Sequence, residues 1–155
     1  MSFQIHGLSH QQFSHLFCLG DDELARHAAR RVVADEMPGF PCRVSLEEAQ
    51  VGEELLLLNY EHQANATPYR SSHAIYVRIG ARQAFPAPGE VPQIMRRRLM
   101  GVRGFDRRHD MIAAEIADGE DLAAAISHMF ENRDVDYLHL HNAKRGCFAA
   151  GVTRA

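Results

Sequence analysis

Residues 38–78 decide the expected fold, and their sequence is PGFPCRVSLEEAQVGEELLLLNYEHQANATPYRSSHAIYVR. Four consecutive leucines at 55–58 predict a strand that is buried on both faces. Apolar residues that alternate along 73–79 predict a second strand. A loop at 61–72 would join the two strands, and a loop of that length is uncommon unless it is functional or disordered. The expected centre of the fold is therefore a pair of strands.

The segment before these strands combines two prolines with a helix-start pattern. Pro38 and Pro41 fix their own φ angles and keep the preceding residues out of the helical region. We therefore expect Cys42 to follow a stiff, irregular segment. Ser45 is followed three residues later by a glutamate, which is the spacing of a capping box, and this predicts a single helical turn at 46–49.

The composition is typical of a globular protein with one domain, residues 1–155. Of the 155 residues, 46% are hydrophobic and 24% are charged, and the net charge is −3 with the histidines neutral. This charge does not favour nucleic acid as a partner. The three cysteines contain no C-x-x-C pair, which indicates a reducing, cytoplasmic compartment. The chain has neither a signal peptide nor an apolar run of about 20 residues, so we expect a soluble protein without a membrane span.

The other patterns predict strands in hairpins with helices inserted between them. Helices are expected to begin at Ser9, Asp21 and Asp118, the last with an apolar stripe at 122–130. Further strands are expected at 3–6, 30–35, 99–103, 109–117, 137–142 and 147–153. In the last strand, Phe148 is predicted to share one face with Ala150 and Val152. Because strands and helices do not alternate regularly, we predict an α+β fold with one mainly antiparallel sheet of about six to seven strands and two to three helices on one face.

Cys42 is the first candidate for chemistry. The guanidinium of the neighbouring Arg43 would stabilise a thiolate, which would make Cys42 a reactive nucleophile. The alternative is a buried cysteine that packs as a small hydrophobic residue, which is the commoner role of free cysteines. Neighbouring side chains on a strand also point in opposite directions. The packing role is therefore the favoured interpretation.

A second candidate site lies at the two ends of the loop between the central strands. Tyr60 and His62 would leave the leucine-rich strand on the same face, and Tyr69 and Arg70 would return on the far side of the loop. Arginine binds carboxylate and phosphate groups with two parallel hydrogen bonds, so these residues would form a pocket for an anion. In the alternative interpretation, Tyr69 and Arg70 only hold the loop in place, and the two interpretations are equally supported.

Two further patterns have simpler explanations. His139 and His141 would share one face of a strand, as pairs of metal ligands do, but no spacing identifies a third ligand. We therefore interpret them as a polar, solvent-facing or partner-facing surface and predict no metal and no cofactor. The arginine-rich run at 96–108 would attract a polyanion, but it has no nucleic-acid-binding signature, and a solvated face is the favoured interpretation.

Four segments carry a resemblance to a known family, and they are PGFPCRVSLEEAQVGEELLLLNYEH, PYRSSHAIYVR, RGFD and HLHNAKRGCFAAGVTR. Together they resemble an uncharacterised bacterial family catalogued as domain of unknown function 1203. The resemblance covers nearly the whole chain and implies a bacterial protein with one compact domain. It implies no activity. The family commonly carries arginine where this chain has His141, which argues against a role for that histidine.

These observations lead to two hypotheses about function. In the first, the C-terminal hairpin brings Asn142 and Cys147 close to Cys42 and to the group of Tyr60, His62, Tyr69 and Arg70. The pocket would bind a small anionic metabolite through Arg43 and Arg70. If the protein also acts on that metabolite, His62 would be the general acid or base and Cys42 the nucleophile.

The second hypothesis is a non-catalytic homodimeric interaction module. Either the face that carries His139 and His141 or an edge strand would form the contact between the two copies. A concave site with Arg70 and His62 would favour the first hypothesis, and a large apolar two-fold contact would favour the second.

Overall fold

The computed structural model describes residues 2–155, and its strands form two antiparallel sheets. The five-stranded sheet has the order β1 (Phe3–His6), β8 (Phe148–Arg154), β7 (Tyr137–Asn142), β5 (Leu99–Phe105) and β6 (Met111–Asp118). The three-stranded sheet has the order β2 (Ala29–Val33), β3 (Glu54–Gln63) and β4 (Ser71–Arg78). The predicted α+β class is confirmed, but the prediction of one sheet with six to seven strands was wrong. The eight strands divide between two sheets.

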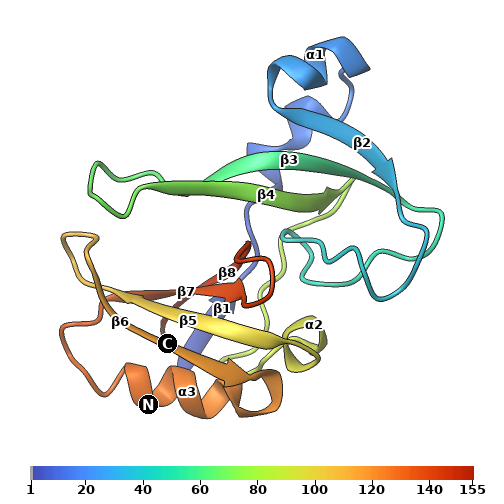
Figure 1. Cartoon of the computed structure of the whole chain (residues 1–155). Helices are drawn as coiled ribbons and strands as arrows, with labels where there is room; N and C mark the ends of the chain where they lie inside the picture. Colours follow the sequence, from blue (N-terminus) through green and yellow to red (C-terminus); the bar gives the residue numbers. More distant parts are fainter. Residues whose placement is uncertain (1) are drawn as a thin grey trace.

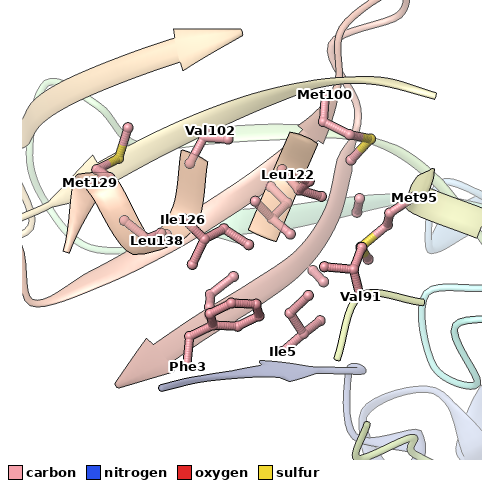
Figure 2. Packing of buried hydrophobic residues seen from close by; sticks show 14 of the residues in the cluster. Phe3, Ile5, Val91, Met95, Met100, Val102, Leu122, Ile126, Met129 and Leu138 are labelled. Carbon is pink, nitrogen blue, oxygen red and sulfur yellow. The ribbon is translucent and has the colours of Figure 1, made fainter. Parts of the chain in front are cut away.

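The two sheets and one helix form layers (Figure 1). Helix α3 (Leu122–Met129) packs beneath the five-stranded sheet, and the three-stranded sheet lies above it, with α1 (Asp21–Arg26) beyond β2. Helix α2 (Gln93–Arg96) precedes β5. Leu122 and Ile126 of α3 pack against Val102 and Leu138 of the sheet (Figure 2), which confirms the predicted apolar stripe. No helix within residues 2–155 has the length and apolarity that crossing a bilayer requires.

Strand β3 is buried on both faces, as its leucines predict. Leu56 and Leu58 belong to the apolar cluster that lies toward Phe148, whereas Leu55 packs on the opposite side. The predicted loop at 61–72 was too long because β3 continues to Gln63 and β4 begins at Ser71. A register shift between Tyr60 and Gln63 allows the two strands to stay paired almost to the turn.

The helical turn predicted at 46–49 does not form. Leu46 has a φ of 55°, which lies outside the right-handed helical region. Pro41 forms an antiparallel bridge with Glu48, and Cys42 forms a parallel bridge with Tyr76 of β4. The carboxylate of Glu48 accepts hydrogen bonds from the backbone amides of Gly39 and Phe40. It is therefore engaged with the preceding segment and does not complete a capping box.

Two 3₁₀ turns replace the first predicted helix, and a 3₁₀ turn precedes the third. Ser9 caps a 3₁₀ turn, η1 (His10–Gln12), by accepting a hydrogen bond from the amide of Gln11, and a second turn, η2 (Ser14–Leu16), follows. The turn η3 (Gly119–Asp121) precedes α3. The predicted helix from Ser9 was therefore wrong in type, although Phe13 and Leu16 are buried as expected.

A bulge in the last hairpin changes which face Phe148 occupies. Leu138 is paired with Val152 and Leu140 with Ala150, but the register shifts so that His141 is paired with Phe148. The prediction that Phe148 faces the same way as Ala150 and Val152 was therefore wrong. Its ring lies between the two sheets, where it packs with the cluster around Leu56 and Leu58.

Candidate functional site

A cavity of about 360 Å³ lies where the 38–43 segment meets the C-terminal hairpin and the end of α2. We call it the basic cavity because its lining includes five basic side chains and one carboxylate. The basic residues are Arg43, Arg97, Arg98, Lys144 and Arg145, and the carboxylate is that of Glu36. Arg97, Lys144 and Arg145 are exposed, whereas Arg43 is buried. The cavity therefore leads from solvent to the Arg43 guanidinium.

Arg43 is held rigidly at the inner end of the basic cavity. Only 3% of it is exposed. Its Nε donates to the carbonyl of Phe148 at 2.8 Å, and one terminal nitrogen donates to the carbonyl of Pro41 at 2.6 Å. Within residues 2–155, Arg43 forms no ion pair with a carboxylate. Burial lowers the pKa of Arg43, because desolvation penalises its charged form.

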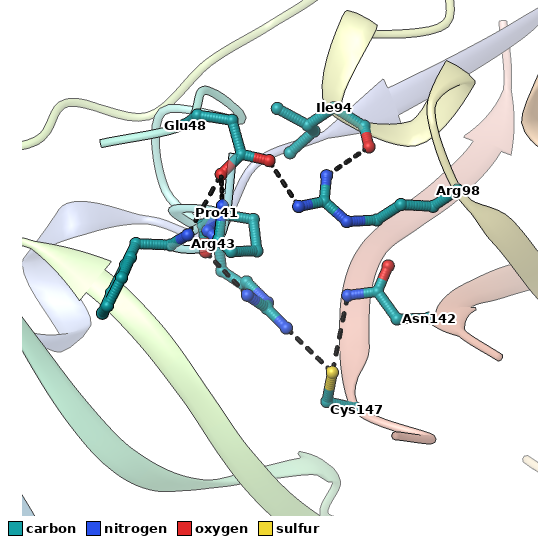
Figure 3. A network of polar contacts seen from close by, with 9 residues as sticks. Pro41, Arg43, Glu48, Ile94, Arg98, Asn142 and Cys147 are labelled. Atoms are coloured by element: carbon teal, nitrogen blue, oxygen red, sulfur yellow. Dashed lines mark hydrogen bonds and ion pairs between the residues drawn. The ribbon is translucent and has the colours of Figure 1, made fainter. Parts of the chain in front are cut away.

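The other terminal nitrogen of Arg43 donates to Cys147 (Figure 3). The distance to Sγ is 3.0 Å, and Nδ2 of Asn142 donates to the same sulfur at 3.4 Å. Asn142 and Cys147 flank the turn of the last hairpin, and the backbone amide of Asn142 donates to the Cys147 carbonyl at 2.9 Å. The hairpin turn therefore fixes this sulfur between two donors.

Arg98 forms the second wall of the basic cavity, and an ion pair within the chain already neutralises part of its charge. It pairs with the nearly buried carboxylate of Glu48, and it also donates to the Ile94 carbonyl at 2.5 Å (Figure 3). That carboxylate also accepts hydrogen bonds from the backbone amides of Gly39 and Phe40, so it connects the 38–43 segment to α2. Arg97 forms no ion pair with any residue in the described range 2–155.

Sequence reasoning identified the inner part of the basic cavity and missed its outer wall. Arg43, Asn142 and Cys147 were predicted to share a site, and all three line the basic cavity. Arg97 and Arg98 were assigned to a solvated face, and Lys144 and Arg145 fell between the two strands predicted at 137–142 and 147–153. The available signal was their charge, but nothing local shows that two basic segments about 45 residues apart meet at Arg43.

Cys42 lies outside the basic cavity and is completely buried. Its sulfur accepts hydrogen bonds from the backbone amides of Ser45, at 3.5 Å, and Arg78, at 3.3 Å. The side chain belongs to the apolar cluster with Val44 and Val77. This position matches the packing interpretation, and Arg43 points to Cys147 rather than to Cys42.

The residues predicted at the two ends of the loop between β3 and β4 do not reach the basic cavity. Arg70 is exposed and pairs with Glu61 at 3.3 Å, and Tyr69 is also exposed. Tyr60 packs edge-on against Phe13 and also contacts Phe148. The structure therefore separates these residues from Arg43, Asn142 and Cys147, whereas the sequence had placed them around one pocket.

His62 joins His139 and His141 between the two sheets, and we call these three residues the histidine cluster. The ring of His62 stacks on that of Phe148 at 5.7 Å and lies 4.9 Å from that of His141 and 6.2 Å from that of His139. His141 is only 1% exposed, so the prediction of a solvent-facing or partner-facing surface was wrong. The bulged β3 strand extends over this face of β7 and covers it.

The histidine cluster favours neutral imidazoles. The pKa of His139 and of His141 is lowered to about 3, mainly by burial and in part by nearby positive groups, including Arg103. His141 donates from Nδ1 to the Gly146 carbonyl at 2.9 Å, and its Nε2 is buried without a hydrogen-bond partner in residues 2–155. Within the same part of the chain, no three His, Cys, Asp or Glu side chains are placed to hold a metal ion.

A larger cavity of about 570 Å³ lies on the other side of the Glu48 segment. Three carboxylates line it, from Glu47, Glu48 and Glu90, with Arg97 as the one basic residue in its lining. Its nearly buried carboxylate, that of Glu48, is already paired with Arg98, so the basic cavity remains the stronger candidate site.

Comparisons with known proteins identify a family but no activity. The family described as "Protein of unknown function (DUF1203)" matches residues 39–154, which include the whole inner wall of the basic cavity. No curated protein and no solved structure matches the chain.

Proposed function

The chain belongs to the DUF1203 family of proteins of unknown function, and we propose that it binds a small anionic metabolite in the basic cavity. The observation that carries this proposal is the buried guanidinium of Arg43, which has no carboxylate partner within residues 2–155. A buried charge without a counter-charge costs several kcal/mol, so the environment of Arg43 favours an anionic group at this end of the cavity.

The cavity also fits a ligand of this class in size and charge. Its volume of about 360 Å³ lies at the small end of the range for ligand sites. Arg97, Lys144 and Arg145 at its mouth would attract an anion and raise its local concentration. Arginine recognises carboxylate and phosphate with paired hydrogen bonds, so we propose a ligand that carries one of these groups. We place this activity in the bacterial cytoplasm, in agreement with three free cysteines.

Titration calorimetry and thermal unfolding with inorganic phosphate and with succinate test this proposal. At a concentration near 100 times the dissociation constant, a bound anion stabilises the fold by about 2.7 kcal/mol. For a chain of this size, that corresponds to a rise in melting temperature of roughly 5 to 10 °C. Increasing NaCl is expected to weaken the binding, because the cations at the mouth are exposed.

Variants of exposed residues separate specific binding from a general charge effect. Arg97→Gln and Lys144→Gln change the wall of the basic cavity and are expected to weaken phosphate binding. Arg82→Gln removes an exposed charge that does not line the cavity, so it is the matched control. If neither anion binds, or if all three variants bind phosphate equally, the proposal is wrong.

A second candidate function is homodimerisation through the edge strand β6. Ile112 and Ile116 point to the same side of β6 and are 42% and 68% exposed. β6 lies at the open edge of the five-stranded sheet, and an open edge with apolar side chains is a template for pairing with a second strand. The favoured partner is the β6 strand of a second copy, because an antiparallel pair of identical edges forms a closed two-fold contact.

Analytical ultracentrifugation of the wild type and of Ile116→Lys tests this candidate. A concentration-dependent dimer that Ile116→Lys converts to a monomer is the expected result. A wild type that stays monomeric at the highest concentration measured would exclude it.

A further inference from the structure

We infer that Cys147 is a nucleophile that reacts with small electrophiles carrying a carboxylate or phosphate group. The inference deepens the proposed function, because it uses the same basic cavity and requires an anion to enter it. Its evidence is the environment of the sulfur, where two fixed nitrogen donors point at Sγ beside the basic cavity.

The hydrogen bonds at Cys147 have the geometry that a thiolate acceptor uses. Sγ accepts hydrogen bonds from the Arg43 guanidinium, which can only donate, and from Nδ2 of Asn142. A thiolate accepts both bonds fully, whereas a thiol accepts them weakly and places its own proton near positive charge. A neighbouring arginine is one of the features that make a cysteine reactive.

The buried charge of Arg43 gives an independent reason for the thiolate. Arg43 forms no ion pair with a carboxylate of residues 2–155, so the sulfur at 3.0 Å is the group that can neutralise it from within the chain. The Arg43 side chain cannot turn away, because the carbonyls of Phe148 and Pro41 hold its other nitrogens. The pair is therefore fixed before any ligand arrives.

The basic cavity selects which electrophile reaches the sulfur. Cys147 lines this cavity, so a small molecule can approach Sγ through it even though the residue is largely buried. The exposed side chains of Arg97, Lys144 and Arg145 would bind the carboxylate or phosphate group of the incoming molecule. In the reaction, the thiolate sulfur forms a bond with the electrophilic carbon. The bond from that carbon to the leaving group breaks, and the leaving group departs with the electron pair.

The position of Cys147 distinguishes it from the other two cysteines. Cys18 is exposed and does not line the basic cavity, and Cys42 is buried in an apolar cluster. Cys18 therefore serves as an accessible reference thiol and Cys42 as an inaccessible one, and the reactivity of Cys147 is compared with both. Rates measured on the same folded sample need no correction for protein concentration or for the fraction folded.

The test compares alkylation by iodoacetate, an anion, with alkylation by iodoacetamide, its neutral counterpart. The rate at each cysteine is obtained by mass spectrometry of the folded protein. In the iodoacetate reaction, the sulfur forms a bond with the CH₂ carbon while the carbon–iodine bond breaks and iodide leaves. We expect the ratio of the iodoacetate rate to the iodoacetamide rate to be at least about tenfold higher at Cys147 than at Cys18.

Two controls connect the rates to the basic cavity. Inorganic phosphate is expected to slow the iodoacetate reaction at Cys147 and to leave Cys18 unchanged. Arg97→Gln is expected to lower the iodoacetate rate at Cys147 but not the iodoacetamide rate, and Arg82→Gln is expected to change neither. Both substitutions replace exposed side chains, so the folded chain remains available for the measurement.

Either of two results would overturn the inference. One is that Cys147 is alkylated only after unfolding in urea, as is expected for Cys42. The other is that Cys147 shows the same preference between the two reagents as Cys18. Calorimetry with phosphate on Cys147→Ser decides the proposed function separately. Binding without thiol reactivity leaves that function standing, and thiol reactivity without binding refutes only the proposed function.

Discussion

The histidine cluster is expected to make the fold sensitive to mild acid. Burial lowers the pKa of His139 and of His141 to about 3, compared with an ordinary value of 6.5. Arg103 of β5 and, when it is protonated, His62 of β3 face the same space and contribute to this lowering of both pKa values. The neutral imidazoles are therefore the forms that the folded chain accommodates.

The sign and size of the effect follow from proton linkage. Between about pH 6.5 and pH 3, each of these histidines is protonated in the unfolded chain and neutral in the folded chain. Stability is therefore complete above about pH 6.5 and falls as the pH decreases, by about 1.4 kcal/mol per pH unit for each histidine. Between pH 7 and pH 5 the loss is about 2 kcal/mol for each, or about 4 kcal/mol for the pair. A typical fold has a total stability of about 5–15 kcal/mol.

The substitution His141→Asn isolates one of the two contributions. The asparagine amide can replace Nδ1 as the donor to the Gly146 carbonyl, but it does not titrate. Urea unfolding followed by circular dichroism at pH 7, 6 and 5 gives the unfolding free energy, since the chain has no tryptophan for fluorescence. We expect the variant to lose about 2 kcal/mol less than the wild type between pH 7 and pH 5.

The comparison between the two proteins also removes the contribution of other groups. Glu53 and Asp106 have lowered pKa values because hydrogen bonds stabilise their carboxylates, but they titrate below this pH range. His15→Asn, at an exposed position, is the matched control and is expected to follow the wild type. If His141→Asn loses stability as steeply as the wild type between pH 7 and pH 5, the reasoning is wrong.

Three further predictions concern the packing of the fold. Glu48→Gln breaks a nearly buried ion pair and is expected to lower the unfolding free energy in urea by about 3 kcal/mol; a loss below about 0.5 kcal/mol would contradict this. Gly119→Ala places a Cβ 2.0 Å from a backbone oxygen and is expected to lower the unfolding free energy by about 3 kcal/mol. Gly151→Ala places its Cβ where no heavy atom lies within 4 Å, so it is expected to be tolerated, and equal melting temperatures of the two variants would refute this difference. Cys42→Ala is expected to cost about 1 to 2 kcal/mol and to leave phosphate binding in calorimetry unchanged, because Cys42 does not line the basic cavity; a loss of binding would place Cys42 in the site.

The sequence by itself determined the elements whose signal is local. The leucines of β3, the alternation along β4 and the stripe of α3 each specify a period that a few neighbouring residues carry. The α+β class and most strands were therefore predictable. Arg43, Asn142 and Cys147 were also predicted to lie together, since they stand in two of the segments that resemble the family, and their side chains are in contact.

Only the tertiary structure decided how these elements meet. Arg43 and Cys147 are 104 residues apart, and their contact depends on how the 38–43 segment docks against the last hairpin. A bulge in β8 turns Phe148 between the sheets, and β3 continues far enough to bring His62 onto His139 and His141. These are consequences of register and of sheet-on-sheet packing, since a shift of one residue moves a side chain to the other face. For that reason the sequence merged two sites that the fold keeps apart, the basic cavity and the histidine cluster.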